Sequence, residues 1–129
     1  MPLPRIAIAT GDPAGIGPEI ALKAAINAGV RALCRPLLVG DPVAVDLHAR
    51  SAGLSPALHV VEDATDADWT DGTVYLLDAR DGSNAPIKFG TVDAAYGRAS
   101  LASARRAIKA ALADYREKHA GTDVEKTPA

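Results

Sequence analysis

The chain has 129 residues, of which 48% are hydrophobic and 23% charged, a balance typical of one soluble globular domain. A formal net charge of -2 argues against an electrostatic surface for nucleic acid or acidic membranes, and no apolar run approaches the ~20 residues of a membrane span. Cys34 is the only cysteine, which excludes an internal disulfide and a cysteine-based zinc site. Because the N-terminus lacks a signal-peptide pattern, we expect a cytoplasmic protein in which Cys34 is a small, buried or half-buried side chain.

The first predicted unit is a strand over residues 5–10 that leads through the segment GDPAGIGPEI into a helix. The strand is apolar enough for burial on both faces of a parallel sheet. The helix is predicted to start with Gly17 as its N-cap and Pro18 at its first position, where the missing N–H of proline is harmless. It is predicted to run to about Ala28, with Gly29 as a left-handed stop.

The next unit repeats this order. A short strand is predicted over residues 36–39, followed by Asp41 as a helix N-cap and Pro42 at the first helical position. The helix over residues 43–52 is predicted to end at Gly53. We expect Asp41 to cap its helix and to have no further role.

Two more strands are predicted over residues 58–61 and 73–77. The connection between them, residues 62–68, is acidic but lacks the glycine and the final glutamate of an EF-hand loop. It is therefore predicted to be a solvated loop without calcium. Trp69 is expected to pack this loop onto the domain.

An irregular stretch over residues 78–90 precedes a long helix predicted over residues 92–118. Apolar residues recur at helical spacing in this helix and predict one buried stripe. The stripe consists of Leu101, Ala104, Ile108, Ala111, Leu112 and Tyr115. The tail, residues 121–129, has no core pattern and is expected to be frayed. The predicted fold is a single α/β domain over residues 1–120, with a mostly parallel sheet and flanking helices.

The segment GDPAGIGPEI supplies the candidate site residues. These are Gly11, Asp12, Gly15, Gly17 and Glu19. A strand that turns through glycines into a helix presents backbone N–H groups to an anion or cofactor. The spacing fits neither a Walker loop nor a dinucleotide fingerprint. Two interpretations remain open: the loop lines a cofactor and substrate cleft, where Asp12 and Glu19 orient polar groups, or it forms only a tight turn in which Asp12 bonds the local backbone.

No catalytic or metal-binding residues are assigned from spacing. His48, His59 and His119 fall in a predicted helix, a predicted strand and a helix end, without ligand spacing such as His-x-x-x-His. No Ser/His/Asp arrangement is evident either. We therefore predict no metal ligand and no catalytic residue in this chain.

The segment GDPAGIGPEI resembles the N-terminal signature of the 4-hydroxythreonine-4-phosphate dehydrogenase family. A looser form, GDGIGPE, opens the isocitrate and isopropylmalate dehydrogenases, which share the fold. The resemblance extends over residues 5–118, through LLVGD at 37–41, GTVYLLD at 72–78 and the helix that follows GTV at 90–92. It implies the N-terminal part of an isocitrate/isopropylmalate dehydrogenase-like fold.

The resemblance also implies a function. Members of this family are homodimers that oxidise phosphorylated hydroxy acids, in pyridoxal phosphate biosynthesis or a related reaction, with NAD and a divalent metal as cofactors. The candidate loop would line the cofactor cleft. The family's metal-binding histidines and its substrate-contacting residues lie beyond the matched segment, so this chain is expected to be the N-terminal part of such an enzyme and inactive by itself.

Two other functions are compatible with the sequence. The chain is either a truncated or diverged remnant that serves as a binding or homo-oligomerisation module, or a complete small anion-binding α/β module. In the first case, apolar surface left uncovered by missing strands would drive association.

Overall fold

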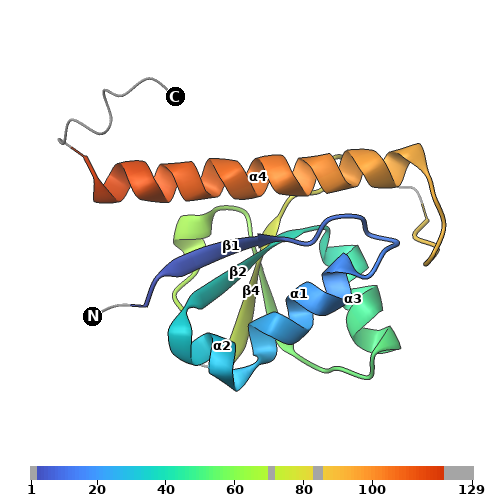
Figure 1. Ribbon diagram of the computed structural model, residues 1–129, viewed down its shortest axis with the longest axis horizontal. Helices are drawn as coiled ribbons and strands as arrows, with labels where there is room; N and C mark the ends of the chain where they lie inside the picture. The colour runs from blue at the N-terminus through green and yellow to red at the C-terminus, as the bar shows by residue number, and fades with distance from the viewer. Residues whose placement is uncertain (1–2, 70–71, 83–85, 121–129) are drawn as a thin grey trace.

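The computed structural model describes residues 3–69, 72–82 and 86–120, and it shows one sheet with helices on both faces (Figure 1). The elements of this part of the chain follow in order. They are β1 (Arg5–Ala9), α1 (Gly17–Ile26), α2 (Ala28–Leu33), β2 (Arg35–Gly40), α3 (Pro42–Ser51), β3 (Ala57–Val61), the 3-10 helix η1 (Ala64–Asp66), β4 (Thr73–Asp78) and α4 (Ala94–Lys118).

The four strands form one parallel sheet in the order β1-β2-β4-β3. Its register places Ile8 of β1 opposite Leu38 of β2, and Leu38 opposite Leu76 of β4. The central strands β2 and β4 are buried almost throughout, whereas the edge strands β1 and β3 are more exposed. The predicted α/β fold with a mostly parallel sheet is therefore confirmed.

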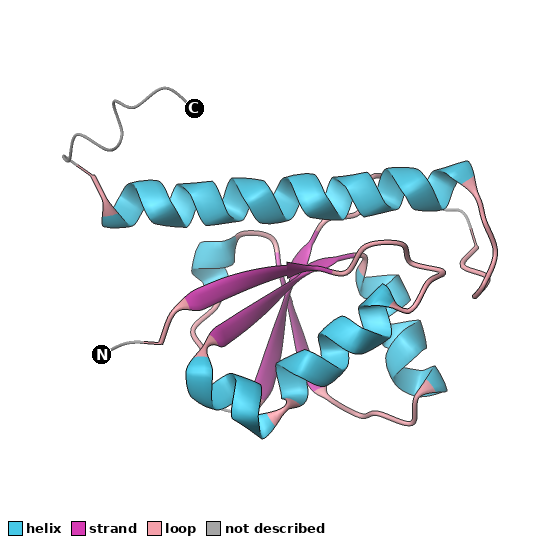
Figure 2. Ribbon diagram, in the orientation of Figure 1, coloured by secondary structure: helices cyan, strands magenta, loops and turns pink. Residues whose placement is uncertain are grey.

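Two apolar clusters hold the helices to the two faces of the sheet. On one face, Leu22 of α1 and Val45 of α3 pack against Leu38 and Leu76. On the other face, Ala107 of α4 and the segment around η1 pack against the opposite sides of β2 and β4. Figure 2 shows this three-layer order, with α4 and η1 on one side of the sheet and α1 and α3 on the other.

The start of α1 differs from the prediction. Its N-cap is Ile16, and Gly17 is the first helical residue. A Cβ atom at Gly17 would overlap the backbone carbonyl oxygen of Thr10. Glycine is therefore required here because α1 begins in direct contact with the end of β1, and not because it caps the helix.

The end of α1 also differs from the prediction. The helix stops at Ile26 because Asn27 adopts an extended conformation, and its Oδ1 accepts the N–H of Val30 at 3.1 Å to start α2. Gly29 lies within α2 and has no left-handed backbone. Cys34, which caps α2 at its C-terminus, is half-buried as predicted.

The predicted caps of α3 and the predicted packing of Trp69 are confirmed, whereas the acidic connection, predicted as a solvated loop, contains the 3-10 helix η1 and the buried Ala67. The Oδ1 of Asp41 accepts the N–H of Val43 at 2.9 Å and caps α3. Gly53 follows α3 with a φ of 71°, the left-handed conformation expected of a helix stop. Trp69 packs edge-on against Tyr75 of β4, with ring centroids 5.4 Å apart, and so holds the β3–β4 connection onto the sheet.

The predicted buried stripe of α4 is wrong. Three of the four buried residues of α4 are small, Ala95, Ser103 and Ala107, and the fourth, Tyr96, hydrogen-bonds the segment that precedes the helix. Leu101, Ile108 and Tyr115 of the predicted stripe are 58%, 61% and 44% exposed. Small side chains allow α4 to lie close to β1 and β2, so its larger apolar residues project away from the sheet. The predicted tail, residues 121–129, lies outside the described residues.

Candidate functional site

The carboxyl ends of β1, β2 and β4 meet at one edge of the sheet, where the motif loop (residues 11–17) begins. The N–H of Thr10 donates to the carbonyl of Val39 at 2.9 Å, and the N–H of Ala79 donates to the carbonyl of Gly40 at 2.9 Å. The helices that follow β2 and β4 lie on opposite faces of the sheet (Figure 1). Open α/β sheets bind ligands at such a switch point, which makes this edge the candidate site.

Gly11 connects the motif loop to α4. Its φ of 75° is in the left-handed region, which glycine adopts without strain. Its N–H donates to the Oγ of Ser103 at 3.3 Å, and Ser103 is a buried residue of α4. The chain therefore leaves β1 in a direction that α4 fixes.

Asp12 and Gly15 form a tight turn within the loop. The Oδ1 of Asp12 accepts the N–H of Ala14 at 2.8 Å, and the carbonyl of Asp12 accepts the N–H of Gly15 at 3.1 Å. This is the local backbone bonding that sequence interpretation gave as one of two alternatives. Asp12 is nevertheless exposed, so its carboxylate also faces solvent at the mouth of the loop.

His48 of α3 anchors the motif loop. It is 6% exposed, and its Nε2 lies 2.8 Å from the carbonyl oxygen of Pro13. Because a carbonyl can only accept, Nε2 carries the proton. The ring also packs on Phe89, with centroids 4.3 Å apart, and the N–H of Gly90 donates to the carbonyl of Ala14 at 2.8 Å. The motif loop is thus held between α3 and the segment that precedes α4.

From the sequence, His48 was weighed as a metal ligand and rejected, and its contact with the motif loop was not predicted. The signal was present, because His48 is the polar member of the buried face of α3. That face also contains Ala44, Val45 and Ala49.

We expect His48→Phe to destabilise the chain by about 2 kcal/mol, because the ring stays but the buried carbonyl of Pro13 loses its donor. His48→Gln, which keeps an N–H donor, is the matched variant and should lose less than half as much. Urea unfolding followed by circular dichroism measures both. Equal losses in the two variants would show that the hydrogen bond to Pro13 does not hold the loop.

Asp78 and Arg80 form an ion pair at the end of β4, with Arg80 Nη2 2.6 Å from Asp78 Oδ2. Partial burial raises the pKa of the Asp78 carboxyl, but the hydrogen bonds from the side chain and backbone N–H of Arg80 outweigh this and hold the pKa below its usual value of 3.8. The same carboxylate raises the pKa of Arg80. The pair therefore keeps the Asp78 carboxylate ionised beside the switch point, with its charge balanced by the Arg80 guanidinium.

Because the pKa of Asp78 is lower in the folded chain than in the unfolded chain, its contribution to stability is present above the unfolded pKa and is lost as the pH falls through the folded pKa. We expect Arg80→Met to lower the urea midpoint slightly at neutral pH, with the difference from the wild type shrinking below about pH 4. Arg50→Met, which breaks a more exposed pair with Asp46, should change nothing measurable. A difference that stays constant down to pH 2 would contradict the lowered pKa of Asp78.

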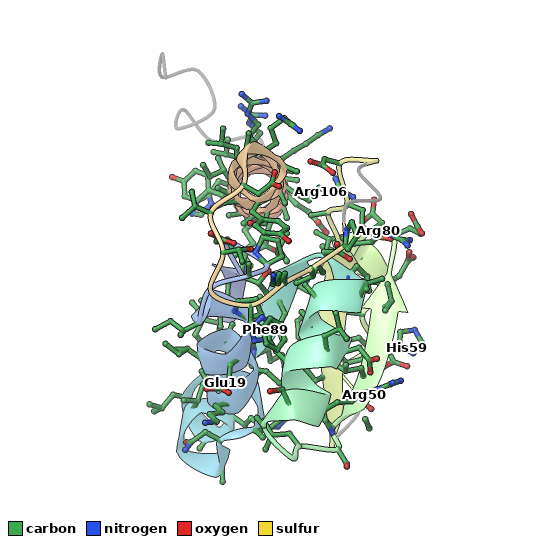
Figure 3. The ribbon with its side chains drawn as sticks, turned by 90° about the vertical axis from the view of Figure 1, so that its right-hand side faces the viewer. Glu19, Arg50, His59, Arg80, Phe89 and Arg106 are labelled. Atoms are coloured by element: carbon green, nitrogen blue, oxygen red, sulfur yellow. The ribbon has the colours of Figure 1, made fainter. Side chains whose placement is uncertain are left out.

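Four of the predicted site residues lie in the motif loop, and the fifth lies just beyond it in α1. Gly11, Asp12, Gly15 and Gly17 all lie in the motif loop. Glu19 lies in the first turn of α1, where its carboxylate is 3.4 Å from the Nζ of Lys23. Figure 3 shows Glu19 on α1, well apart from Arg80.

The described residues do not fit a metal centre. No group of three or more His, Cys, Asp or Glu side chains converges within residues 3–69, 72–82 and 86–120. The three histidines have other contacts: His48 binds Pro13, His59 packs on Tyr75, and His119 stacks on Tyr115.

Among the motif-loop glycines, Gly17 serves internal packing, because a Cβ atom there would overlap the carbonyl oxygen of Thr10. At Gly15 and Gly11 no atom lies nearer than 3.6 Å and 3.9 Å to the position that a Cβ would take, so these two positions have room for a side chain.

A parallel sheet with helices on both faces and a glycine-rich loop at its switch point defines an α/β domain of the type found in many enzymes. None of the helices in the described part has the length and hydrophobicity needed to cross a lipid bilayer. No family model matches the chain.

The chain is similar to dehydrogenases of one family. It is 39% identical over 109 residues to a protein of Symbiobacterium thermophilum provisionally named D-threonate 4-phosphate dehydrogenase, a match that covers 84% of this chain and 32% of that protein. It is 38% identical over 76 residues to the 4-hydroxythreonine-4-phosphate dehydrogenase of Desulfosudis oleivorans, covering 59% and 22%. The crystal structure of the Burkholderia phymatum 4-hydroxythreonine-4-phosphate dehydrogenase matches with a TM-score of 0.77 and 32% identity, covering 87% of this chain and 34% of that one.

The resemblance predicted from the motif loop, to the 4-hydroxythreonine-4-phosphate dehydrogenase family, is therefore confirmed. The chain spans about a third of the length of the relatives and structures that it matches.

Proposed function

We propose that the chain supplies the motif-loop side of the active-site cleft in an NAD-dependent, divalent-metal-assisted dehydrogenase of a phosphorylated hydroxy acid. The observation that carries this proposal is the position of the motif loop, which stands at the switch point of a fold shared with dehydrogenases. Asp12 is the member of the loop with an exposed carboxylate. We infer that it orients a polar group of the substrate or cofactor, while Gly11, Gly15 and Gly17 shape the loop.

The metal and most of the substrate contacts would come from the part of the protein that this chain does not span. Two observations support this division: no metal-ligand cluster lies among the described residues, and the relatives are about three times as long as the match. The chain by itself would then be inactive. The substrate class follows the names of the relatives, D-threonate 4-phosphate and 4-hydroxythreonine 4-phosphate.

A chimera tests this role. The matched segment of the Symbiobacterium thermophilum relative is replaced by this chain, and NADH formation from D-threonate 4-phosphate is followed. Asp12→Asn keeps the oxygen that accepts the N–H of Ala14 but removes the charge, and it should lower kcat/KM about tenfold or more.

The matched control is Asp63→Asn. Asp63 accepts the N–H of Thr65 at 2.9 Å in the same kind of turn, away from the motif loop. The kcat/KM of the Asp63→Asn chimera should therefore stay within about twofold of that of the parent chimera. Equal activity of the Asp12→Asn and Asp63→Asn chimeras would contradict the proposed role of Asp12.

A second function is favoured by the exposed apolar residues of α4. Leu101, Ile108, Leu112 and Tyr115 lie on one side of the helix and are 44–61% exposed. In the isolated chain this surface would support homo-oligomerisation as a binding module. Light scattering tests it: the wild type should have the mass of a dimer or larger, and Ile108→Asp should reduce it to a monomer. A monomeric wild type would contradict this function.

A further inference from the structure

The free edge of β1 has the sequence of an interior strand. β1 pairs with β2 on one side and with no described strand on the other. From Ile6 to Ala9 it contains no proline or charge, the features that usually protect an edge from pairing. Ile6 is 45% exposed at this edge. A continuous apolar run of this kind is typical of a strand with neighbours on both sides.

The backbone of β1 points alternate residues outward. The N–H of Thr10 donates to β2, and the carbonyl of Pro4 accepts from Arg35 of β2 at 2.8 Å. In a parallel strand the N–H and C=O of one residue point to the same side, and the side alternates along the strand. Ala7 and Ala9 therefore present their backbone groups to the free edge, whereas Ile8 bonds to β2.

The flank of α4 on the side of β1 continues this uncovered surface. The other flank faces the η1 side of the sheet, because it contains Arg106, which donates to the carbonyl of Glu62 at 2.7 Å. By helical geometry, Ala104, Ala111 and Tyr115 lie on the flank away from η1, which is the side of β1. Figure 1 shows α4 passing over β1. The free edge of β1 and this flank of α4 together form one docking surface.

The course of the chain indicates what belongs there. α1 and α3 carry the chain from β1 toward β3 along one face, and α4 carries it back along the other face, over β2 and β1. α4 ends near the start of β1, where Asp114 forms an ion pair with Arg5. Because crossovers between parallel strands are right-handed in nearly all proteins, a strand that follows α4 lies parallel to β1 at its free edge.

We propose that the docking surface binds an apolar parallel β-strand, and that this strand belongs to the polypeptide that the dehydrogenase relatives have outside the matched third. Their remaining length, about twice that of the match, provides the occupant. The strand would pair with the outward backbone groups of Ala7 and Ala9 and pack its side chains against the flank of α4. This inference does not depend on the catalytic role of Asp12.

Hydrogen exchange measures the proposed pairing directly. The amides of Ala7 and Ala9 should exchange at least about tenfold more slowly in the chimera with the Symbiobacterium thermophilum relative than in the isolated chain. The Ile8 amide is the control within the same strand and should be protected in both. The proposal fails if Ala7 and Ala9 exchange equally fast in both proteins, or if the chimera also leaves Ile8 unprotected.

Two edge substitutions add a matched comparison. Ile6 in β1 and Val60 in β3 are each 45% exposed on an edge strand. Ile6→Lys should abolish the added protection of Ala9 in the chimera, whereas Val60→Lys should leave it unchanged. Ala7→Pro, which removes an outward N–H and spares the bonds to β2, should act like Ile6→Lys.

A second copy of the chain is the competing occupant. Protection of Ala7 and Ala9 that is already present in the isolated chain, and that disappears on dilution, would assign the edge to a homodimer and overturn the proposal. Activity does not enter this test. A chimera with a protected β1 edge and no NADH formation would refute the proposed function alone, and an active chimera with an unprotected edge would refute this inference alone.

Discussion

Gly17→Ala is expected to destabilise the chain by about 3 kcal/mol, because the added methyl group overlaps a backbone carbonyl that has no room to move. The carbonyl is that of Thr10, at the end of β1, and the methyl group would sit on the first residue of α1. Relief would require α1 to move away from the sheet, which would disrupt the packing of Leu22 against Leu38. Urea unfolding of the purified variant measures the loss.

Gly97→Ala is the control for Gly17→Ala. Gly97 is also helical, in α4, but nothing lies within 4 Å of the position that its Cβ would take. Alanine there should stabilise the chain by about 0.5–1 kcal/mol, the ordinary gain in helix propensity. A loss for Gly17→Ala no larger than about 1 kcal/mol would show that α1 does not begin against the carbonyl of Thr10.

Gly40→Ala is expected to cost about 2–3 kcal/mol, but for a reason that a second substitution can remove. A Cβ atom at Gly40 would overlap the side chain of Thr10, which is 2% exposed and so has little freedom to rotate away. Thr10→Ala deletes the Oγ1 and Cγ2 atoms that cause most of this overlap. The double variant should therefore recover at least about 1 kcal/mol relative to the sum of the two single losses.

The same Thr10→Ala substitution should not rescue Gly17→Ala, because the overlap at Gly17 involves the backbone of Thr10 and not its side chain. Two double-mutant cycles, one of Thr10 with Gly40 and one of Thr10 with Gly17, therefore distinguish the side-chain contact of Thr10 from its backbone contact. Additive losses for Gly40→Ala and Thr10→Ala would contradict the packing of Thr10, at the end of β1, against Gly40, at the end of β2.

The elements that depend on local chemistry were predictable from the sequence. Asp41 and Pro42 start α3, and Gly53 stops it, because capping and left-handed turns involve only neighbouring residues. The end of α1 was missed although its cause is local. Asn27 both ends that helix and caps α2, a double role that the nearby Gly29 obscured.

The parts that depend on tertiary contacts were not predictable. The sequence predicts Gly17 as a helix cap, and only the position of Thr10 shows that glycine is needed there to avoid an overlap with a carbonyl oxygen. The apolar spacing in α4 predicted a buried stripe, but the sheet is covered by Ser103 and Ala107, whose small size matters only once β1 and β2 are in place. His48 likewise acquires its role from Pro13, which is distant in the sequence.

We propose that this chain forms one part of a dehydrogenase and does not contain a complete active site. The most direct test is NADH formation by the purified chain with NAD, a divalent metal and either 4-hydroxythreonine 4-phosphate or D-threonate 4-phosphate. We predict no NADH above the rate without protein, and formation of NADH by the chimera under the same conditions. Metal-dependent NADH formation by the chain alone would contradict the claim.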